Sequence, residues 1–268
     1  MRALLLAAGM GTRLQPLTYV LPKCLVPIHG RPLLDYWLEC LLDHGVDEVL
    51  INTHYLAPLV VGFIERSSWA RCVTVVHEDR LLGTGGTILK NRAFFRDEAF
   101  FVAHADNLTL FDVREFAIRH AGRPAGTRLT MMLFETDDPQ SCGIVELDER
   151  GVVKAFHEKV AAPPGNLANA AMYVFEPFVM DLLAGLGKDE IDLSTEIIPG
   201  LMGGIFTYRN TSYHRDIGTM ANWIEANRHF PVMPAAACNA QAWAKVMGLE
   251  NANLNSTIEI LLGRSEGA

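Results

Sequence analysis

Short apolar runs alternate with helical patterns over the first half of the chain, and this alternation constrains the fold most strongly. The run Arg2–Ala8 is apolar and ends at glycine, as expected of a buried parallel strand, whereas Leu33–His44 spaces its leucines as a helix does. The pattern repeats, with strands predicted at 49–52, 73–77 and 99–103 and helices at 58–66, 85–95 and 113–120. This alternation predicts crossover units and a parallel sheet, which binds ligands beyond the carboxyl ends of its strands.

The rhythm changes after about residue 128, where strands dominate. Strands are predicted at 129–135, 144–147, 152–157 and 169–175, with a turn at Asp148–Gly151. Helices are predicted at 178–186 and 219–228, and a further one after Ser194, which precedes an apolar run as an N-cap would. The predicted fold class is therefore α/β, with a doubly wound, mostly parallel sheet and a smaller second β region.

Length and composition predict one main domain with an appendage. The chain has 268 residues and 50% hydrophobic content, which suits a single large core. We expect the domain to cover residues 1–230 and a C-terminal helical tail to cover 231–268. Pro231–Ala240 is interpreted as a linker before two short helices. The tail is expected to serve oligomerisation or domain packing, so a homo-oligomer is one expectation.

Charge and cysteine content narrow the partners. The formal net charge of −8 disfavours a general nucleic-acid or anionic-membrane surface, although a small cationic pocket for an anionic metabolite remains compatible with it. The five cysteines are scattered without a CxxC pair, which favours reduced thiols in a cytoplasmic protein. No apolar run approaches the roughly 20 residues of a membrane-spanning helix, and no signal peptide is apparent at the N-terminus.

The stretch "LLLAAGMGTRLQPLTYVLPK", from Leu4 to Lys23, suggests an anion-binding loop of an uncommon kind. A P-loop requires GxxxxGK[ST], which is absent, and a dinucleotide fingerprint requires a third glycine where Leu14 stands. Two prolines also argue against a helix opening there. The remaining interpretation is a long glycine-rich loop whose N–H groups wrap a nucleoside triphosphate. Arg13 could then fork two phosphate oxygens, and Lys23 could supply a point charge.

The segment "LLLAAGMGTRLQPLTYVLPKCLVPIHGRPLLDY" resembles the signature of sugar-1-phosphate nucleotidyltransferases, and mannose- and heptose-1-phosphate guanylyltransferases in particular. A structural glycine turn with incidental cations is the alternative. The resemblance extends to about residue 230 and implies a Rossmann-like nucleotidyltransferase fold whose smaller β region faces the sugar. The nucleotide-binding residues that it implies are Leu6, Ala8, Gly9, Gly11, Thr12, Arg13, Lys23, Glu78, Gly83 and Thr84.

The reaction of that family joins two polyanions and releases pyrophosphate. The sugar phosphate is already an anionic nucleophile, so catalysis requires positioning and charge neutralisation rather than a general base. The resemblance implies Arg13, Lys23 and Asp106 as catalytic residues and Mg²⁺ as the cofactor. Mg²⁺ prefers oxygen ligands and usually takes one or two carboxylates from the protein. The implied product is a nucleotide-sugar for glycan or capsule assembly.

Two aspartates resemble the metal ligands of the family. "FVAHADNL" ends a predicted strand with Asp106, where the family has GDN and this chain has Ala105 for the glycine. "YHRDIGTMANWIEAN" resembles the D-x-G-T segment and implies Asp216 as the second carboxylate. An aspartate before a helix is also a common N-cap, so that alternative stays open.

A second group of motifs resembles the sugar-binding side. "GIVELDERGVVKAFHEKV" resembles the family's sugar-binding hairpin, with Glu158 for sugar hydroxyls and Lys159 for the acceptor phosphate. The family's proline is Val160 here, and a solvated Glu-Lys pair is the alternative. "LANAAMYVFEP" resembles "NAGIYVF". The implied sugar-phosphate-binding residues are Asn107, Gly143, Glu158, Lys159 and Asn169.

The choice of nucleobase depends on "VVHEDRLLGTGGTIL", from Val75 to Leu89, where Glu78 occupies the family's base-reading position. A carboxylate only accepts hydrogen bonds, and guanine offers two adjacent donors, so a contact with Glu78 favours GTP. Glu78 could instead face solvent or Arg80. UTP, dTTP or CTP as donor, an amino-sugar phosphate as acceptor, and a non-catalytic paralogue that binds nucleotide-sugars remain alternatives.

Overall fold

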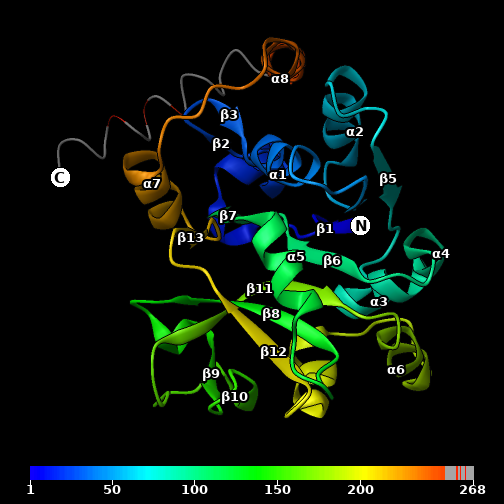
Figure 1. Cartoon of the computed structure of the whole chain (residues 1–268). Coiled ribbons are helices and arrows are strands. Elements are labelled where there is room, and N and C mark those ends of the chain that lie inside the picture. The colour runs from blue at the N-terminus through cyan, green and yellow to red at the C-terminus, as the bar shows by residue number, and fades with distance from the viewer. Residues whose placement is uncertain (251–257, 259, 261–262, 264–268) are drawn as a thin grey trace.

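The computed structural model describes residues 1–250 together with residues 258, 260 and 263, and its centre is a nine-stranded sheet (Figure 1). The order β10-β9-β11-β6-β1-β4-β5 forms one path, and β8 pairs with β11 and β12. The strands of this sheet are β1 (Arg2–Leu6), β4 (Glu48–Thr53), β5 (Val73–His77), β6 (Phe100–His104), β8 (Leu129–Glu135), β9 (Gly143–Leu147), β10 (Val153–Glu158), β11 (Leu167–Phe175) and β12 (Ile205–Arg209).

The sheet is parallel in its first part and mixed in its second. Strand β1 pairs in parallel with both β4 and β6, and β4 pairs in parallel with β5. Strand β11 then runs antiparallel to β6, β8 and β9. The predicted α/β fold with a mostly parallel central sheet is confirmed.

Two smaller sheets lie beside the main one. Strands β2 (Pro27–Ile28) and β3 (Arg31–Pro32) form a short ribbon, and β7 (Asn107–Leu110) pairs with β13 (Tyr213–Asp216). Strands β7, β12 and β13 were not predicted from the sequence. The β13–β7 ribbon joins segments about a hundred positions apart, which local sequence patterns cannot reveal.

Helices cover both faces of the sheet, because side chains alternate between two hydrophobic clusters along each central strand. In β1, Ala3 and Leu5 face the cluster under α1 (Leu33–Leu42), whereas Leu4 faces the cluster under α3 (Gly83–Lys90). The first cluster also takes side chains from α2 (Ala57–Arg66), α5 (Val113–Ala121), α7 (Met220–His229) and α8 (Ala237–Glu250). The second takes them from α4 (Arg92–Phe95) and α6 (Val179–Gly185).

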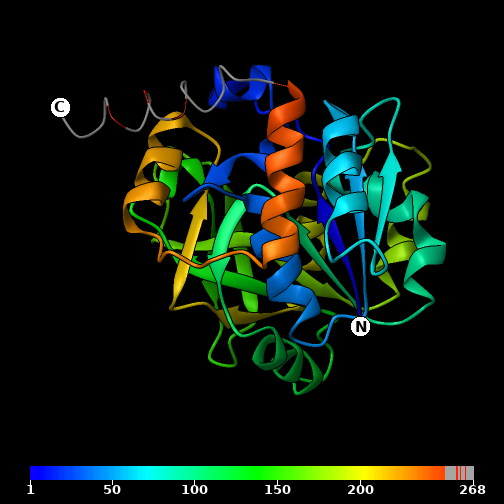
Figure 2. The ribbon, with the colours of Figure 1, turned by 90° about the horizontal axis from the view of Figure 1, so that it is seen from above.

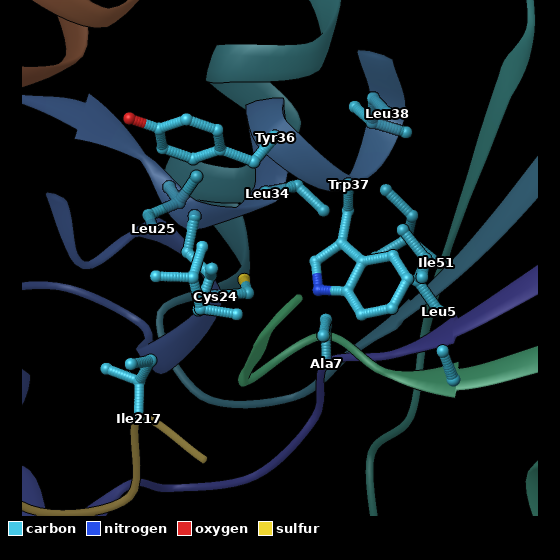
Figure 3. Packing of buried hydrophobic residues seen from close by; sticks show 14 of the residues in the cluster. Leu5, Ala7, Cys24, Leu25, Leu34, Tyr36, Trp37, Leu38, Ile51 and Ile217 are labelled. Atoms are coloured by element: carbon cyan, nitrogen blue, oxygen red, sulfur yellow. The ribbon is translucent and has the colours of Figure 1, made fainter. Parts of the chain in front are cut away.

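Trp37 on α1 links the helical layer to the segment that carries the site (Figure 3). Its indole is buried against Leu5 and Ile51, and its Nε1–H donates to the carbonyl of Asn107 at 2.7 Å. Because a buried indole N–H needs a partner, this bond fixes the chain immediately after Asp106.

Two predictions about local structure were wrong. The helix after Ser194 is a π-helical turn (Leu193–Ile197) followed by a 3-10 turn (Ile198–Leu201), and its N-cap is Asp192, which accepts from the Thr195 N–H. The predicted linker 231–240 already contains the start of α8, which lies alongside α2 (Figure 2). Alanines support helix here, and Trp243 and Val246 are buried. The rest of the tail, apart from residues 258, 260 and 263, lies outside the described residues.

Candidate active site

The glycine-rich loop leaves the carboxyl end of β1 and turns sharply at Gly11. Gly11 adopts φ +62°, and an added Cβ would lie 2.9 Å from Cγ2 of Thr18. The Thr18 hydroxyl donates to the Gly11 carbonyl at 2.7 Å and so closes the turn. Gly9 has open space around it and Arg13 is exposed, so the backbone and one cation of the loop face solvent, accessible to a ligand.

Lys23 is the buried cation of the site. The 3-10 turn Lys23–Leu25 directs its ammonium to the Asp106 carboxylate, with which it forms an ion pair, and 3.3 Å from Oδ1 of Asp216. Burial would raise the pKa of Asp106, but the charges of Lys23 and His104 outweigh it and hold that pKa below its ordinary value. Both carboxylates therefore converge on one ammonium.

The β13–β7 ribbon brings these two carboxylates together. Asp216 pairs in register with Asn107, and the Ile217 N–H donates to the Asp106 carbonyl at 2.9 Å. The ribbon thus places residues from the middle and from the end of the domain side by side. The structure brings Asp106 and Asp216 together, whereas the sequence implied this only through its resemblance to the family.

A cavity of about 250 Å³ unites most of the predicted residues. Gly143 and Glu158 face each other across the β9–β10 hairpin, and a Cβ at Gly143 would lie 2.7 Å from the Glu158 carboxylate. Lys159 follows with φ +49° and its ammonium 3.5 Å from Glu158. The predicted residues in the cavity wall are Arg13, Lys23, Asp106, Asn107, Gly143, Glu158, Lys159, Asn169 and Asp216.

Two amides order the wall formed by β11. Asn107 is buried and donates to the Ala170 carbonyl at 3.0 Å. Asn169 donates to the Tyr173 hydroxyl at 2.7 Å and accepts from the N–H of Ala171, which has φ +54°. A primary amide has a second N–H and a second lone pair, so Asn169 keeps capacity for a ligand.

The remaining predicted nucleotide-binding residues do not line this cavity. Gly83 and Thr84 pack on another part of the protein: a Cβ at Gly83 would lie 2.4 Å from the Ile191 carbonyl oxygen, and the Thr84 hydroxyl accepts from the Leu193 N–H at 2.8 Å. Their glycine-rich pattern is thus explained by close approach of the backbone at 191. Nucleotide contacts stay a prediction for Leu6, Ala8, Gly9, Gly11, Thr12, Gly83 and Thr84.

Glu78 neither faces solvent nor pairs with Arg80, which were the two alternatives to a base contact. It is 1% exposed, and its carboxylate accepts from Asn52, Thr87 and the Leu82 N–H. Arg80 pairs with Asp189 instead. A guanine contact requires a free carboxylate edge, so this geometry does not support the direct contact predicted from the sequence.

His214 is a cavity residue that the sequence analysis missed. It lies on β13 two positions before Asp216, and its ring packs on Phe134 with centroids 4.2 Å apart. Burial lowers the pKa of His214 to about 3, so the imidazole is neutral. The period of two in "HRD" would have indicated a shared face with Asp216, had a strand been expected there.

Comparison with known proteins decides the family. The family model described as nucleotidyl transferase matches residues 2–231. The chain belongs to the nucleotidyl transferase family.

This chain has curated relatives whose names specify different nucleotides. It is 33% identical over 230 residues to mannose-1-phosphate guanylyltransferase of Mycobacterium tuberculosis, covering 84% of this chain and 63% of that protein. It is 30% identical over 239 residues to glucose-1-phosphate thymidylyltransferase of Streptomyces griseus, covering 85% and 65%. The chain thus spans somewhat less than two thirds of the length of these relatives.

Solved structures share the fold of this chain at low identity. A putative glucose-1-phosphate thymidylyltransferase from Bacillus anthracis, in complex with a sucrose, superimposes with a TM-score of 0.79 at 19% identity, covering 89% of this chain and 98% of that one. HddC from Yersinia pseudotuberculosis gives 0.73 at 23% identity, covering 86% and 99%. These likenesses confirm the fold.

The residues of the site fit a magnesium ion. Within residues 1–250 no group of three or more His, Cys, Asp or Glu side chains could hold a metal, but Asp106 and Asp216 converge from one ribbon. Mg²⁺ is typically held by one or two carboxylates together with substrate phosphates, so this donor set suits it.

Among the helices that the structure describes, none is long and apolar enough to span a membrane.

Proposed function

We propose that this chain transfers a nucleotidyl group from a nucleoside triphosphate to a sugar 1-phosphate and releases pyrophosphate. The observation that carries the proposal is one cleft that gathers Arg13, Lys23 and Lys159 around the carboxylates Asp106 and Asp216. Three cations in one cleft suit two phosphorylated substrates, although the chain as a whole is acidic. Asp106 and Asp216 would hold Mg²⁺, which neutralises phosphate charge when bound.

The proposed step needs little acid–base chemistry from the protein. An oxygen of the sugar phosphate forms a bond to the α-phosphorus, the bond from that phosphorus to the bridging oxygen breaks, and pyrophosphate leaves with the electron pair. Arg13 and Lys23 neutralise the triphosphate, and Lys159 orients the acceptor phosphate. Charge neutralisation and alignment then supply the rate enhancement.

At a finer level we propose GTP as donor and mannose 1-phosphate or a manno-heptose 1-phosphate as acceptor. Relatives named mannose-1-phosphate guanylyltransferase from Mycobacterium tuberculosis and Arabidopsis thaliana support this choice, as does the HddC structure titled as a complex with GMP-PN. The thymidylyltransferase and uridylyltransferase among the relatives are reasons for testing dTTP and UTP alongside. Glu78 is buried and its carboxylate accepts hydrogen bonds from the protein, so it gives no support to the choice of GTP.

The test is pyrophosphate release from GTP, UTP, dTTP, CTP and ATP with a panel of sugar 1-phosphates and Mg²⁺. Turnover is expected to be highest with GTP and to stop when EDTA removes the metal. Arg13→Ala with Lys23→Ala should abolish release, and Asp106→Asn with Asp216→Asn should do the same, whereas Lys245→Ala on the exposed face of α8 should not. Undiminished turnover without both cations would refute the proposed function, and GTP as the poorest donor would refute the proposed base.

A further inference from the structure

Three buried polar side chains connect the carboxyl ends of adjacent strands beside the glycine-rich loop. Asn52 is the fifth residue of β4, Glu78 directly follows β5, and Thr87 lies on α3; they are 3%, 1% and 0% exposed. We call this set the Glu78 network. It lies outside the cavity that gathers the charged residues of the site.

The Glu78 network reaches two backbone segments that border the proposed nucleotide site. The Ala7 N–H, at the root of the glycine-rich loop, donates to Oδ1 of Asn52 at 2.8 Å. The side chain of Asn52 then donates to Oε1 of Glu78 at 3.1 Å. Glu78 Oε2 accepts from the N–H of Leu82 at 3.3 Å, just before α3. One carboxylate thus joins the loop after β1 to the start of α3.

The hydrogen bonds also constrain the carboxylate itself. Oε1 accepts from the Thr87 hydroxyl at 2.6 Å, and the donors named are a neutral amide, a neutral hydroxyl and a backbone N–H. The nearby cation Arg80 is engaged with Asp189. Removing one donor to a buried carboxylate costs the folded protein stability, because no water can reach the carboxylate to replace the lost hydrogen bond. A fully satisfied network of this kind rigidifies the segments that it joins.

We propose that Glu78 is a positioning residue, which holds the glycine-rich loop and the first turn of α3 in the arrangement that binds the triphosphate, and that it does not read the base. The proposal deepens the proposed function and rests on it. Because the network touches backbone at Ala7 and Leu82, its loss affects every triphosphate alike. A residue that read the base would instead change the order of preference among triphosphates.

The test combines hydrogen exchange with steady-state kinetics in Glu78→Gln. A glutamine presents one acceptor and one donor group, so it cannot accept from Asn52, Thr87 and Leu82 together. We expect faster exchange in peptides covering Ala7 and Leu82, and kcat/KM reduced about tenfold or more by the same factor for GTP, UTP, dTTP and CTP. The KM for the triphosphates should rise while the KM for the sugar 1-phosphate stays unchanged. A smaller folded fraction would instead lower kcat and leave both KM values unchanged.

Two further variants keep the result interpretable. Thr87→Val removes one donor at nearly constant shape and should give the same pattern, even if Glu78→Gln folds poorly. Asp79→Asn, a neighbouring acid with a fully exposed side chain, should change neither exchange nor preference. A changed order of triphosphates with unchanged exchange at Ala7 would overturn the proposal. If wild-type protein turned over no triphosphate, the proposed function would fail, and exchange would still decide whether Glu78 orders both segments.

Discussion

At the scale of single residues, Lys159 is the clearest candidate for binding the acceptor. Lys159 directly follows the last residue of β10 in a left-handed backbone conformation, and its side chain is 65% exposed beside Glu158. A side chain that is held by one weak ion pair is available to a phosphate. Substituting it should therefore affect the acceptor and leave the triphosphate largely unaffected.

We expect Lys159→Met to raise the KM for the sugar 1-phosphate about tenfold to a hundredfold, as loss of a charge-assisted hydrogen bond predicts. The KM for the triphosphate should change little. Lys154→Met is the matched control, because Lys154 lies on β10, which Lys159 directly follows, and pairs with Glu146 instead. Initial rates at varied acceptor concentration give both constants, and equal effects of the two substitutions would contradict the assignment.

His120 couples stability to pH at the end of α5. Its ring contacts Thr130 at 2.8 Å and Glu176 at 3.1 Å, and burial with the nearby Arg123 charge lowers its pKa below the ordinary 6.5. As the pH falls through 6.5, the unfolded chain binds the proton before the folded chain does. The stability contributed by neutral His120 is therefore present above that pH and is lost below it.

We expect His120→Gln to reduce the loss of stability between about pH 7.5 and about pH 5.5. Glutamine keeps a donor and an acceptor but does not titrate. Urea denaturation midpoints of wild type and variant at both pH values measure the difference. His44→Gln, at an exposed position, should leave the wild-type pH dependence in place. An identical pH dependence in His120→Gln would show that other groups cause it.

At the scale of elements, α3 contains glycines because the segment 189–191 packs closely against its backbone. Gly86 lies inside the helix, and a Cβ built there would be 2.0 Å from the Asp189 carbonyl oxygen. The Gly85 N–H donates to the Ile191 carbonyl at 2.8 Å, which holds the two segments together. Helix propensity would favour alanine, so close approach of the backbone decides these positions.

Gly86→Ala should therefore destabilise the protein by about 1–3 kcal/mol, because the 189–191 segment must move to admit a methyl group. Gly62→Ala in α2 is the matched control, since its added Cβ would meet only the flexible end of Arg66 at 3.2 Å. That substitution should be neutral or stabilising by up to about 1 kcal/mol. Midpoints of chemical denaturation compare the two, and a Gly86→Ala protein as stable as Gly62→Ala would contradict the packing argument.

The elements also show what the sequence could and could not predict. Strong periodicity located β5 and β8 at their observed bounds, because alternation and apolar runs are local signals. The β13–β7 ribbon has four-residue strands paired across the domain, and nothing local specifies that pairing. Glu78 stands in the polar run "HEDR", so its burial depends on hydrogen bonds to Asn52 and Thr87, 26 and 9 positions away.

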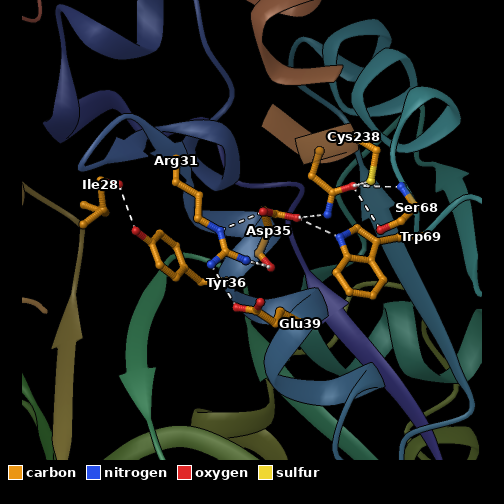
Figure 4. A network of polar contacts seen from close by, with 9 residues as sticks. Ile28, Arg31, Asp35, Tyr36, Glu39, Ser68, Trp69 and Cys238 are labelled. Atoms are coloured by element: carbon orange, nitrogen blue, oxygen red, sulfur yellow. Dashed lines mark hydrogen bonds and ion pairs between the residues drawn. The ribbon is translucent and has the colours of Figure 1, made fainter. Parts of the chain in front are cut away.

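At the scale of the whole molecule, one buried carboxylate on α1 connects that helix to the segment after α2 and to α8. Asp35 is fully buried and accepts from Arg31 at 2.7 Å and from the Trp69 indole at 2.7 Å (Figure 4). Asn239 on α8 donates to the same carboxylate at 2.9 Å and accepts from the Ser68 N–H at 2.8 Å. Asn239 therefore attaches α8 to the rest of the fold.

We expect Asn239→Ala to cost about 1–3 kcal/mol, because it leaves buried partners on Asp35 and Ser68 unsatisfied. Gln241→Ala, an exposed substitution on the same helix, should cost little. Denaturation midpoints, together with proteolysis near residue 236, measure stability and release of α8. Equal midpoints for the two variants would mean that apolar contacts alone hold α8.

Because the β13–β7 ribbon brings Asp106 and Asp216 together, a chain that is cut before β13 cannot form the complete site. Lys23 and Asp216 are 193 positions apart, yet they share one ion cluster. A fragment that ends before β13 carries the loop cations and one carboxylate but never both acids. Two separately expressed pieces would bring both acids together only on reassembly, so a cut between β12 and β13 would separate Asp216 from Lys23 and Asp106.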